Sequence, residues 1–345
     1  MIKKGIILFV LIIMISLGLL IYIPIAILSV NILSYDNIDE SDSFIYEPSS
    51  PSLVKKLYIN VEFGDIEIRY TEPLVDYFVK IDMSFELSGV NLTGKNYSDF
   101  FNIIWHTTNA SAHLTLELSS ESWFDDTLWV SRNVDILVSI RMDVVFDIIT
   151  RLSEGNYEIS VPWAVTTGNL LTNVSKGNIS YDLKCCTIEG KVAGNVNEGD
   201  IFYNFDRCII GGDITGITNE GDLELKSYNV EYTQNSNWIL NSSGDMNIEV
   251  SQYKEMSANV TGIAWIIDGI LDLFYKDNTA NIGAYFFFPL LSGAPILPQE
   301  GFNTIFQSEK IWLISSDFPT INNYNLTLYI TNPASRCRNI ELHSD

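Results

Sequence analysis

The pattern of apolar and polar residues divides this 345-residue chain into one long uncharged stretch and a remainder of short alternating segments. Residues 5–32 are almost wholly apolar and contain no charged side chain. A helix needs about 20 such residues to cross the hydrocarbon core of a bilayer, whereas a signal peptide has an apolar core of roughly 7 to 15. The pattern predicts a transmembrane signal anchor over residues 5–32, with a cleaved signal peptide as the alternative.

The charges on either side of this stretch predict its orientation. Lys3 and Lys4 precede it, whereas only acidic charged residues follow it as far as position 47. Because basic residues stay on the cytoplasmic side, residues 1–4 are expected to form a cytoplasmic tail and the rest of the chain to be extracellular. We therefore expect a single-pass protein of the cell membrane that contacts the lipid bilayer through its N-terminal helix. Residues 33–54, which are acidic and rich in Ser and Pro, are predicted to form a stalk.

Beyond the stalk, apolar and polar residues alternate over short segments. Alternation with a period of two predicts strands with one buried face. The clearest segments are residues 57–61, 66–68, 77–81, 113–118 and 134–140. Long amphipathic helical patterns are absent from the sequence, so the ectodomain is predicted to be all-β.

Two series of glycines recur at a step of 22 residues. The first series is followed each time by Asn or Asp, and its last step is 23 residues. Its glycines are Gly155, Gly177, Gly199, Gly221 and Gly244, followed by Asn156, Asn178, Asp200, Asp222 and Asp245. The second series is Gly168, Gly190 and Gly212. A step this constant indicates a repeat architecture.

Each repeat has the residues that a stack of parallel strands needs. Glycine adopts left-handed backbone angles at a corner without strain, and Asn or Asp can hydrogen-bond to the backbone there. The second and fourth residues after each glycine are apolar and should point inward. Neighbouring strands lie ~4.8 Å apart, so equivalent residues such as Ile179, Ile201 and Leu223 should form columns inside the coil.

The expected fold is an all-β, parallel β-solenoid with 22-residue rungs over residues 153–262. Open strand edges at the ends of such a stack need covering. Residues 55–152 and 263–345 are therefore predicted to form an N-terminal β cap and a C-terminal β cap. An antiparallel sandwich would explain the alternation, but it would not explain the constant step.

Several of these segments also resemble a known family. Residues 57–68 read Leu-Tyr-Ile-Asn-Val-Glu-Phe-Gly-Asp-Ile-Glu-Ile, and residues 134–140 read Val-Asp-Ile-Leu-Val-Ser-Ile. With the Gly-Asn/Asp-apolar-x-apolar units that continue through Gly244, the chain resembles the putative-adhesin β-strand-repeat family of bacteria and archaea over residues 57–262. The resemblance implies an envelope protein built of β repeats. Because that family has no established active site, it implies no catalytic or cofactor-binding residue.

The charge of the ectodomain limits its partners. All 43 acidic residues follow position 35, and 18 of the 20 basic residues do, so this part carries a formal charge of −25. Such a surface repels nucleic acid and anionic headgroups, and a nucleic-acid partner is not expected. The charge would favour cations or basic partners, although an acidic surface kept for solubility explains it as well.

The corner residues Asp200, Asp222 and Asp245 are weak calcium candidates. Calcium takes about six to eight oxygen ligands from dense acidic loops. The glycine-rich nonapeptide of calcium-binding β-rolls is missing, and only Gly211-Gly212-Asp213 approaches it. Asx turns at the corners are the preferred explanation, so no metal or cofactor is predicted.

The sequence offers little support for catalysis, and no catalytic residue is predicted. The three histidines, His106, His113 and His343, are scattered, and the common hydrolase and phosphate-binding motifs do not occur. A glycan-active enzyme would need paired carboxylates in a cleft. Asp182 with Asp206, and Glu198 with Glu220, fall on adjacent rungs, but acidic pairs arise by chance in such a chain.

The four cysteines include one pair at the repeat step. Cys186 and Cys208 are 22 residues apart and should stack on adjacent rungs. Strands ~4.8 Å apart fall within the Cα separation of about 4.4 to 6.8 Å that a disulfide tolerates. The pair is therefore either a disulfide or a column of buried thiols. Cys185 should face the other way, where it could reach Cys337.

Eight Asn-x-Ser/Thr sequons lie in the ectodomain and are predicted glycosylation sites in an extracellular protein. They are Asn91, Asn96, Asn109, Asn173, Asn178, Asn241, Asn259 and Asn325. Their number modestly exceeds what the composition gives by chance.

Together these features predict a membrane-anchored extracellular solenoid with a structural, adhesive or ligand-presenting role at the cell envelope. Its expected partner is an envelope protein, a surface polymer or a neighbouring cell. The interaction area of a repeat face grows with the number of rungs, which suits this role. A sensor or receptor ectodomain that works with a partner, and a glycan-active enzyme on a β-helix, are the alternatives.

Overall fold

The computed structural model describes residues 35–47, 54–90, 92, 94–95, 99, 101–108, 113–120, 129–254, 258–277, 282–289, 302–307, 310–315, 324–331 and 336–344. Over these ranges the chain is all-β, as predicted. None of the described segments forms a helix of the length and apolarity needed to span a bilayer. The predicted cytoplasmic tail (1–4) and signal anchor (5–32) lie outside the described residues.

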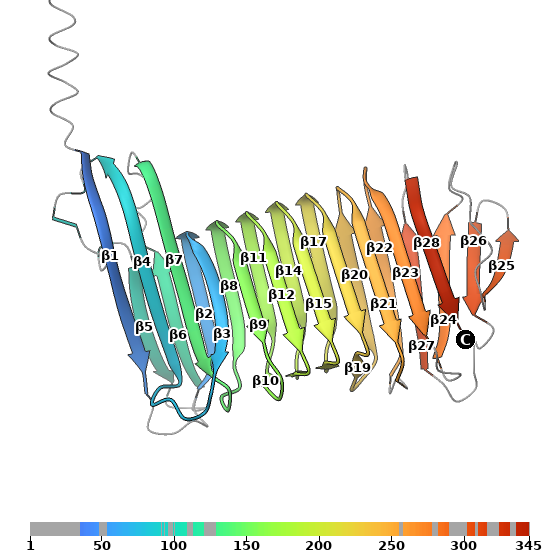
Figure 1. Ribbon diagram of the computed structural model, residues 1–345, viewed down its shortest axis with the longest axis horizontal. Helices are drawn as coiled ribbons and strands as arrows, with labels where there is room; N and C mark the ends of the chain where they lie inside the picture. Colours follow the sequence, from blue (N-terminus) through green and yellow to red (C-terminus); the bar gives the residue numbers. More distant parts are fainter. Residues whose placement is uncertain are drawn as a thin grey trace, which may run out of the picture.

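The centre of the molecule is a coil with three strands per turn (Figure 1). One turn consists of β12 (Ile179–Lys184), β13 (Thr187–Ile188) and β14 (Val192–Glu198). The next turn consists of β15 (Ile201–Asp206), β16 (Ile209–Ile210) and β17 (Ile214–Glu220). Each strand pairs in parallel with the strand one turn later.

Stacked turns build three sheets, called A, B and C below. Sheet A contains, in spatial order, β1 (Tyr35–Tyr46), β4 (Val79–Val90), β7 (Trp129–Arg141), β3 (Asp65–Thr71), β9 (Tyr157–Val161), β12, β15, β18 (Leu223–Tyr228), β21 (Met246–Gln252), β23 (Ile270–Asp277) and β28 (Arg336–Ser344). Sheet B contains β25 (Phe302–Gln307), β26 (Lys310–Ser315), β24 (Ile282–Pro289), β27 (Tyr324–Thr331), β22 (Val260–Ile266), β20 (Ser236–Ser242), β17, β14, β11 (Leu170–Lys176), β8 (Asp147–Glu154), β2 (Val54–Phe63), β6 (His113–Ser120) and β5 (Phe101–Thr108). The short sheet C contains β10 (Thr166–Thr167), β13, β16 and β19 (Glu231–Tyr232).

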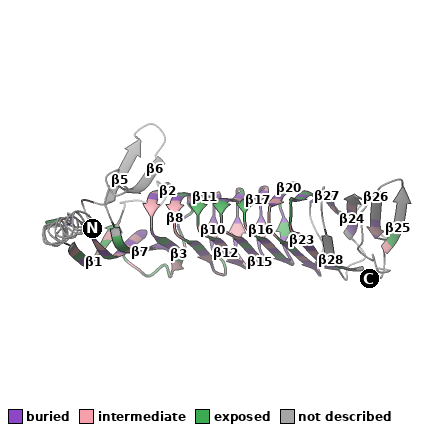
Figure 2. Ribbon diagram, turned by 90° about the horizontal axis from the view of Figure 1, so that it is seen from above, coloured by how far each residue is buried: buried purple, intermediate pink, exposed green. Residues whose placement is uncertain are grey.

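The core lies between sheets A and B, where the inward side chains of both sheets are buried (Figure 2). Ile179 pairs with Ile201, and Ile201 pairs with Leu223, each at most 1% exposed. This confirms the predicted column of stacked apolar residues. In-register stacking keeps like side chains in contact from turn to turn, which is how a repeat protein closes a continuous core.

A second inner column of sheet A contains two tyrosines. The rings of Tyr181 and Tyr203 stack with centroids 5.1 Å apart, and both side chains are buried. The Tyr181 hydroxyl donates to the carbonyl of Ala193, and the Tyr203 hydroxyl donates to the carbonyl of Thr215. Burial raises the pKa of both phenols. The polar ends of these rings are thus satisfied by the backbone of sheet B.

The two predicted kinds of glycine corner differ in structure. Gly177 has φ +132° and Gly199 has φ +138°, and the first series takes the left-handed angles that favour glycine at every member except Gly244. The second series shows no such angle. At Gly212 a Cβ would lie 2.5 Å from the carbonyl oxygen of Gly190, so close packing between turns explains the glycine there. The expectation of left-handed corners was therefore wrong for the second series and for Gly244.

A different set of residues supplies the other left-handed corner. Cys185, Arg207 and Asn229 have φ between 49° and 55°, and they recur at the repeat step. No glycine marks this corner in the sequence, so the repeat step of glycines did not reveal it.

The parallel stack extends beyond residues 153–262. β2 pairs in parallel with β8, and β3 pairs in parallel with β9. Their corner, Gly64, has φ +136°, close to the +137° of Gly155. The 22-residue step fails here because β4 to β7 are inserted between Gly64 and Gly155. Part of the predicted N-terminal cap is thus a turn of the coil itself.

The segment predicted to be a stalk forms an edge strand over its described part. β1 pairs antiparallel with β4 along its full length. Ile38 is buried, and Phe44 and Tyr46 pack against the core. These three residues lie on the same face of the strand. The acidic residues between them hid this strand pattern in the sequence. The outer edge of β1 carries Asp39 and other acids, and charges of this kind discourage edge-to-edge aggregation.

Candidate interaction surfaces

The corner between sheets B and A carries a ladder of Asn and Asp side chains. Each Oδ1 atom accepts a hydrogen bond from the backbone N–H of the equivalent residue one turn later. The N–O distances are 2.7 to 3.1 Å. Written with the donor first, the bonds are Asn156 to Asp65, Asn178 to Asn156, Asp200 to Asn178, Asp222 to Asp200, Asp245 to Asp222 and Ile270 to Asp245. The ladder extends the predicted corner role, since the side chains bond to the next turn rather than to their own.

This ladder accounts for the three calcium candidates. Asp200, Asp222 and Asp245 each use one carboxylate oxygen to hold the next turn. Asparagine serves equally well at Asn156 and Asn178, which shows that the bond needs an oxygen and not a charge. Within the described residues, no three His, Cys, Asp or Glu side chains come together in a group that could hold a metal ion.

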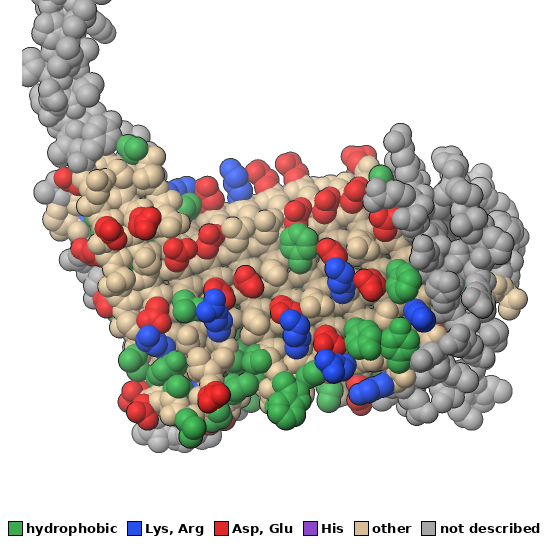
Figure 3. All heavy atoms as spheres, in the orientation of Figure 1, with side chains coloured by type: hydrophobic (Ala, Val, Ile, Leu, Met, Phe, Trp, Pro, Cys, Tyr) green, Lys and Arg blue, Asp and Glu red, His purple; other side chains and the backbone are tan. Residues whose placement is uncertain are grey.

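The outer face of sheet A is densely charged (Figure 3). Two central rows cross it. One row is Asp82, Leu137, Glu67, Glu158, Ser180, Phe202, Glu224, Asn247 and Asp272, and the other is Lys80, Ser139, Arg69, Ser160, Asp182, Asn204, Lys226, Glu249 and Phe274. Ten of these 18 residues are charged, which makes this the solvated face of the coil.

Most of the basic residues of this face pair with an acid two positions away on the same strand. Lys80 lies 2.8 Å from Asp82, and Lys184 lies 2.7 Å from Asp182. Arg69 with Glu67 and Lys226 with Glu224 repeat the arrangement. Exposed pairs of this kind contribute little to stability. They do, however, neutralise the cations locally and leave the surplus acids to set the charge of the face.

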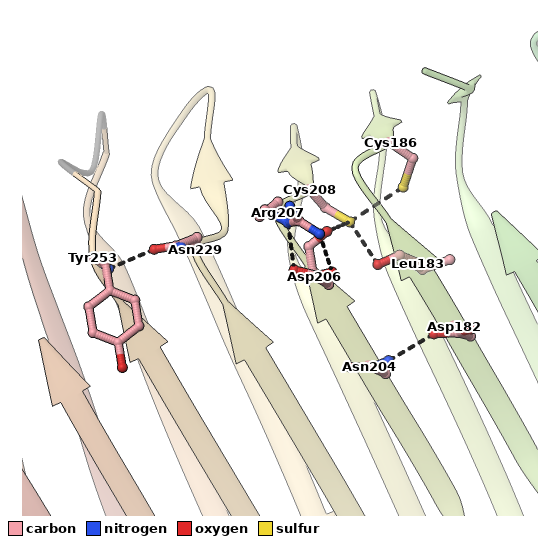
Figure 4. A network of polar contacts seen from close by, with 9 residues as sticks. All are labelled: Asp182, Leu183, Cys186, Asn204, Asp206, Arg207, Cys208, Asn229 and Tyr253. Carbon is pink, nitrogen blue, oxygen red and sulfur yellow. Dashed lines mark hydrogen bonds and ion pairs between the residues drawn. The ribbon is translucent and has the colours of Figure 1, made fainter. Parts of the chain in front are cut away.

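The acidic pairs considered for glycan chemistry lie on open surfaces. Asp182 pairs with Lys184 and accepts from Asn204, and Asp206 pairs with Arg207 (Figure 4). Hydrolysis would require one carboxyl held protonated by burial or by a neighbouring acid. These two carboxylates lie beside cations on an open surface instead, so neither has the surroundings that such a role requires.

The outer face of sheet B differs sharply from that of sheet A. One row, called the apolar row, consists of Tyr58, Ile149, Leu171, Ala193, Thr215, Ile239, Ile263, Tyr329 and Phe287. The neighbouring amide row consists of Asn60, Arg151, Asn173, Asn195, Ile217, Asn241, Trp265 and Thr331. Arg151 is the single charged residue among these 17. The two faces of the coil thus offer opposite chemistry.

The apolar character of sheet B increases toward the C-terminal end. Ile239 and Ile263 are each 48% exposed, and Trp265 is 52% exposed. Tyr329 lies beside Ile263, with Phe287 on its far side. Large apolar side chains gathered on neighbouring strands mark interaction sites more often than scattered ones do. This patch is the strongest candidate binding surface in the described part of the chain.

The aromatic rings of the patch do not lie in one plane. The rings of Tyr285 and Tyr329 are 6.2 Å apart with an interplanar angle of 62°. The rings of Phe287 and Tyr329 are 6.0 Å apart with an angle of 54°. The first pair packs edge to face and the second is tilted, so the three rings do not form a flat stacking platform.

Sequence reasoning missed this face although a signal was present. The residue six positions before the corner glycine is Tyr58, Ile149, Leu171, Ala193 and Thr215 in successive turns. Alternation assigns these positions to the outside, where polar residues are expected. The signal was the absence of charge at an outward column in an otherwise acidic chain.

Cys186 and Cys208 stack on adjacent turns (Figure 4). Their sulfur atoms are 3.4 Å apart, and both side chains are buried. This separation is a contact between thiols, since a disulfide bond is about 2.05 Å long. Cys208 also donates to the carbonyl of Leu183. The hydrogen bond with Cys208 and then burial raise the pKa of the Cys186 thiol.

The sequons occupy different environments. Asn173 and Asn178 are exposed, whereas Asn241, Asn259 and Asn325 are half-buried. Asn91, Asn96 and Asn109 lie outside the described residues, as does the side chain of Cys337. Glycosylation of all eight stays a prediction.

Comparisons with known proteins concern the fold alone. No family model and no curated protein matches the chain. Among solved structures, a putative cell adhesion protein from Clostridium sporogenes is 12% identical, with a TM-score of 0.28, and the match covers 88% of this chain and 100% of the other. A putative adhesin from Bacteroides fragilis is 11% identical, with a TM-score of 0.38, and the match covers 88% of this chain and 97% of the other.

A putative lipid binding protein from Parabacteroides distasonis is 10% identical, with a TM-score of 0.27, over 88% of this chain and 97% of the other. All three TM-scores are below 0.5. At these values the similarities assign neither a family nor a function to this chain.

Proposed function

We propose that the chain is a membrane-tethered β-solenoid with a structural, adhesive or ligand-presenting role at the cell envelope. The observation that carries this proposal is the in-register stack itself. It produces two broad faces, each continuous over many strands, and the central rows are charged on sheet A and nearly uncharged on sheet B. A surface repeated from turn to turn suits contact with an extended partner.

The position of the chain ends supports a display role. β1 lies at one end of the coil, and β25 lies at the other (Figure 1). Residues 5–32, the proposed anchor, precede β1 in the sequence. An anchor at this end would hold the coil by one extremity, with its faces turned to the medium. The excess of acid in the ectodomain would keep such a rod soluble and repel anionic headgroups.

The distribution of acids and bases supports binding over catalysis. Several carboxylates of sheet A and of the corner ladder are paired with cations or hydrogen-bonded to the next turn, among them Asp82, Asp182 and Asp200. One hollow on the described surface is open to solvent and is lined by Lys184, Asp206 and Lys226 among others. Enzyme sites are usually concave and exclude water.

Topology in intact cells tests the proposal. An epitope tag at the C-terminus should be accessible to antibody and protease outside the cell, whereas a tag at the N-terminus should not be. Cells that lack the chain should bind fewer neighbouring cells or retain less envelope polymer than cells that carry it. A C-terminal tag protected from added protease would overturn the proposed location. Release of sugars from a polysaccharide panel would favour the enzymatic alternative.

A further inference from the structure

We propose that the outer face of sheet B is a self-association surface, against which a second copy of this chain packs face to face. The inference rests on the proposed display role and names the partner for it. It does not depend on which envelope component the other face meets. The surface consists of the apolar row and the amide row.

Charge favours a second copy as the occupant. The ectodomain has a formal charge of −25, so two copies repel each other wherever their acidic surfaces meet. The two rows of sheet B contain one charge among 17 residues, whereas the two rows of sheet A contain ten among 18. Arg151 is held over the ring of Tyr58, 5.7 Å from its centroid. Copies can therefore approach through sheet B at the least electrostatic cost.

Ring geometry favours a protein partner over a sugar. A glycan needs flat, exposed ring faces, but Tyr329 meets its aromatic neighbours at 54° and 62°. Ile263 lies beside Tyr329 on the neighbouring strand, and Ile239 and Trp265 add exposed aliphatic and indole surface to the patch. Irregular apolar surface of this kind is buried by interdigitation with another sheet, as in a sandwich.

The available area is sufficient for a weak specific interface. From β8 to β24 the two rows cross eight strands. At ~4.8 Å per strand, and with outward residues ~6.8 Å apart along a strand, the footprint is about 500 Å² on each copy. Two copies then bury about 1,000 Å², the lower limit for a specific interface. Tethering on one membrane would raise the effective concentration and favour so weak a contact.

The shared membrane selects the arrangement. A two-fold axis along the coil, midway between the two rows, makes each turn face the same turn of the partner and overlaps both rows fully. The apolar row of each copy then faces the amide row of the other, so Ile263 lies opposite the partner's Trp265 and one row away from the partner's Ile263. This arrangement keeps the β1 ends of both copies on one side, as a shared membrane would require. An antiparallel pair would place those ends on opposite sides.

Cross-linking of the full chain tests the arrangement. Ile263→Cys and Phe202→Cys place a thiol at exposed positions of sheets B and A, 48% and 39% exposed respectively. Each variant is reconstituted in uncharged phosphatidylcholine vesicles as the sole protein and treated with a short bifunctional maleimide. We expect several-fold more covalent dimer from Ile263→Cys than from Phe202→Cys or the unmodified chain. Equal yields would overturn the proposal.

A second pair of variants separates the interface from general folding. Added to Ile263→Cys, the change Ile239→Asp should lower the dimer yield about tenfold, since a carboxylate would be buried without a partner. Tyr228→Asp is the matched control on sheet A, 42% exposed, and should leave the yield unchanged. Higher salt should increase dimerisation by screening the acidic surfaces.

The alternative occupants give different results. A tryptophan fluorescence shift in the vesicles that Trp265→Phe removes, without covalent dimer, would show that the face lies on the bilayer, and would overturn the proposal. A cross-linked product of another mass in native membranes, with no dimer, would show a different protein partner and do the same. Asn173 and Asn241 lie on this face, so the proposal requires both sequons to be unmodified, and glycans found on either would overturn it. None of these outcomes changes the result expected from the tag-accessibility experiment, which tests the proposed function separately.

Discussion

Tyr203 of sheet A occupies the space that Gly216 of sheet B leaves open. A Cβ added to Gly216 would lie 2.8 Å from Cε2 of Tyr203, closer than side chains tolerate. One turn later the column of Tyr203 continues with Leu225, and that of Gly216 continues with Leu240. The large Tyr203 and the small Gly216 of one turn are thus replaced in the next turn by two leucines of intermediate size. The inner columns of the two facing sheets therefore compensate each other in volume.

This relationship predicts an asymmetric pair of variants. Gly216→Leu should lower the free energy of unfolding by about 1–3 kcal/mol, because the added side chain overpacks the core against Tyr203. Gly216→Leu with Tyr203→Leu copies the next turn and should recover much of the loss. Denaturant unfolding of the full chain measures both. A double variant no more stable than the single one would contradict the compensation.

The Asx ladder predicts that charge is dispensable at the corner. Asp222→Ala removes the oxygen that accepts from the Asp245 N–H and should cost about 0.5–1.5 kcal/mol. Asp222→Asn keeps that oxygen and should be nearly neutral. Thermal melts of the two variants, with and without added calcium, measure the difference. A calcium-dependent rise in Tm that Asp222→Asn abolishes would instead support the metal interpretation.

The two stacked thiols predict a disulfide in the protein exposed to oxidising conditions. Exchange with the disulfide of an oxidised catalyst would join Cys186 to Cys208 and reduce that catalyst to its dithiol, which takes up the two electrons and the two protons. Closing a loop of this length stabilises a fold by roughly 3 kcal/mol. Mass spectrometry of unreduced peptides should show the linked pair. In the reduced protein, half-buried Cys185 should react with alkylating reagents before Cys186, whose pKa is raised. Rapid labelling of Cys186 would contradict this.

The buried phenols predict loss of stability at high pH. Burial raises the pKa of Tyr157 to about 12, against about 10 for an unfolded tyrosine. Because the folded state favours the neutral phenol, its contribution is complete below pH 10 and is lost as the pH rises toward 12. Phenolate absorbance of this residue should therefore appear together with unfolding. Tyr157→Phe should move the unfolding midpoint to higher pH, and phenolate formation with native circular dichroism would argue against burial.

The sequence predicted the central coil because its repeat is local. Gly177 and Gly199 mark one corner through their backbone angles, and columns such as Ile179 and Ile201 follow from the fixed step. The turn containing Gly64 escaped the same reasoning, although Gly64-Asp65 has the same corner motif. Its partner lies 91 residues away, beyond an insertion that no periodicity can measure.

The candidate surface was harder to predict for a different reason. Burial follows from alternation, but the use of an outward face depends on what the whole sheet displays. Ile239 and Trp265 are unremarkable singly and become a patch only when β20 and β22 lie side by side. Similarly, acidic composition at β1 suggested a stalk, whereas the buried Ile38 shows that three apolar residues sufficed for sheet pairing.

The long insertion between β3 and β8 has a consequence for biosynthesis. Turns from β8 onward can assemble from neighbours close in sequence, as each new strand adds to the one before. β2 and β3 emerge from the ribosome first, yet their partners β8 and β9 follow only after the insertion has been made. The end of the rod nearest the proposed anchor should thus be the last to close, and its unpaired strands are the ones a chaperone would need to shield.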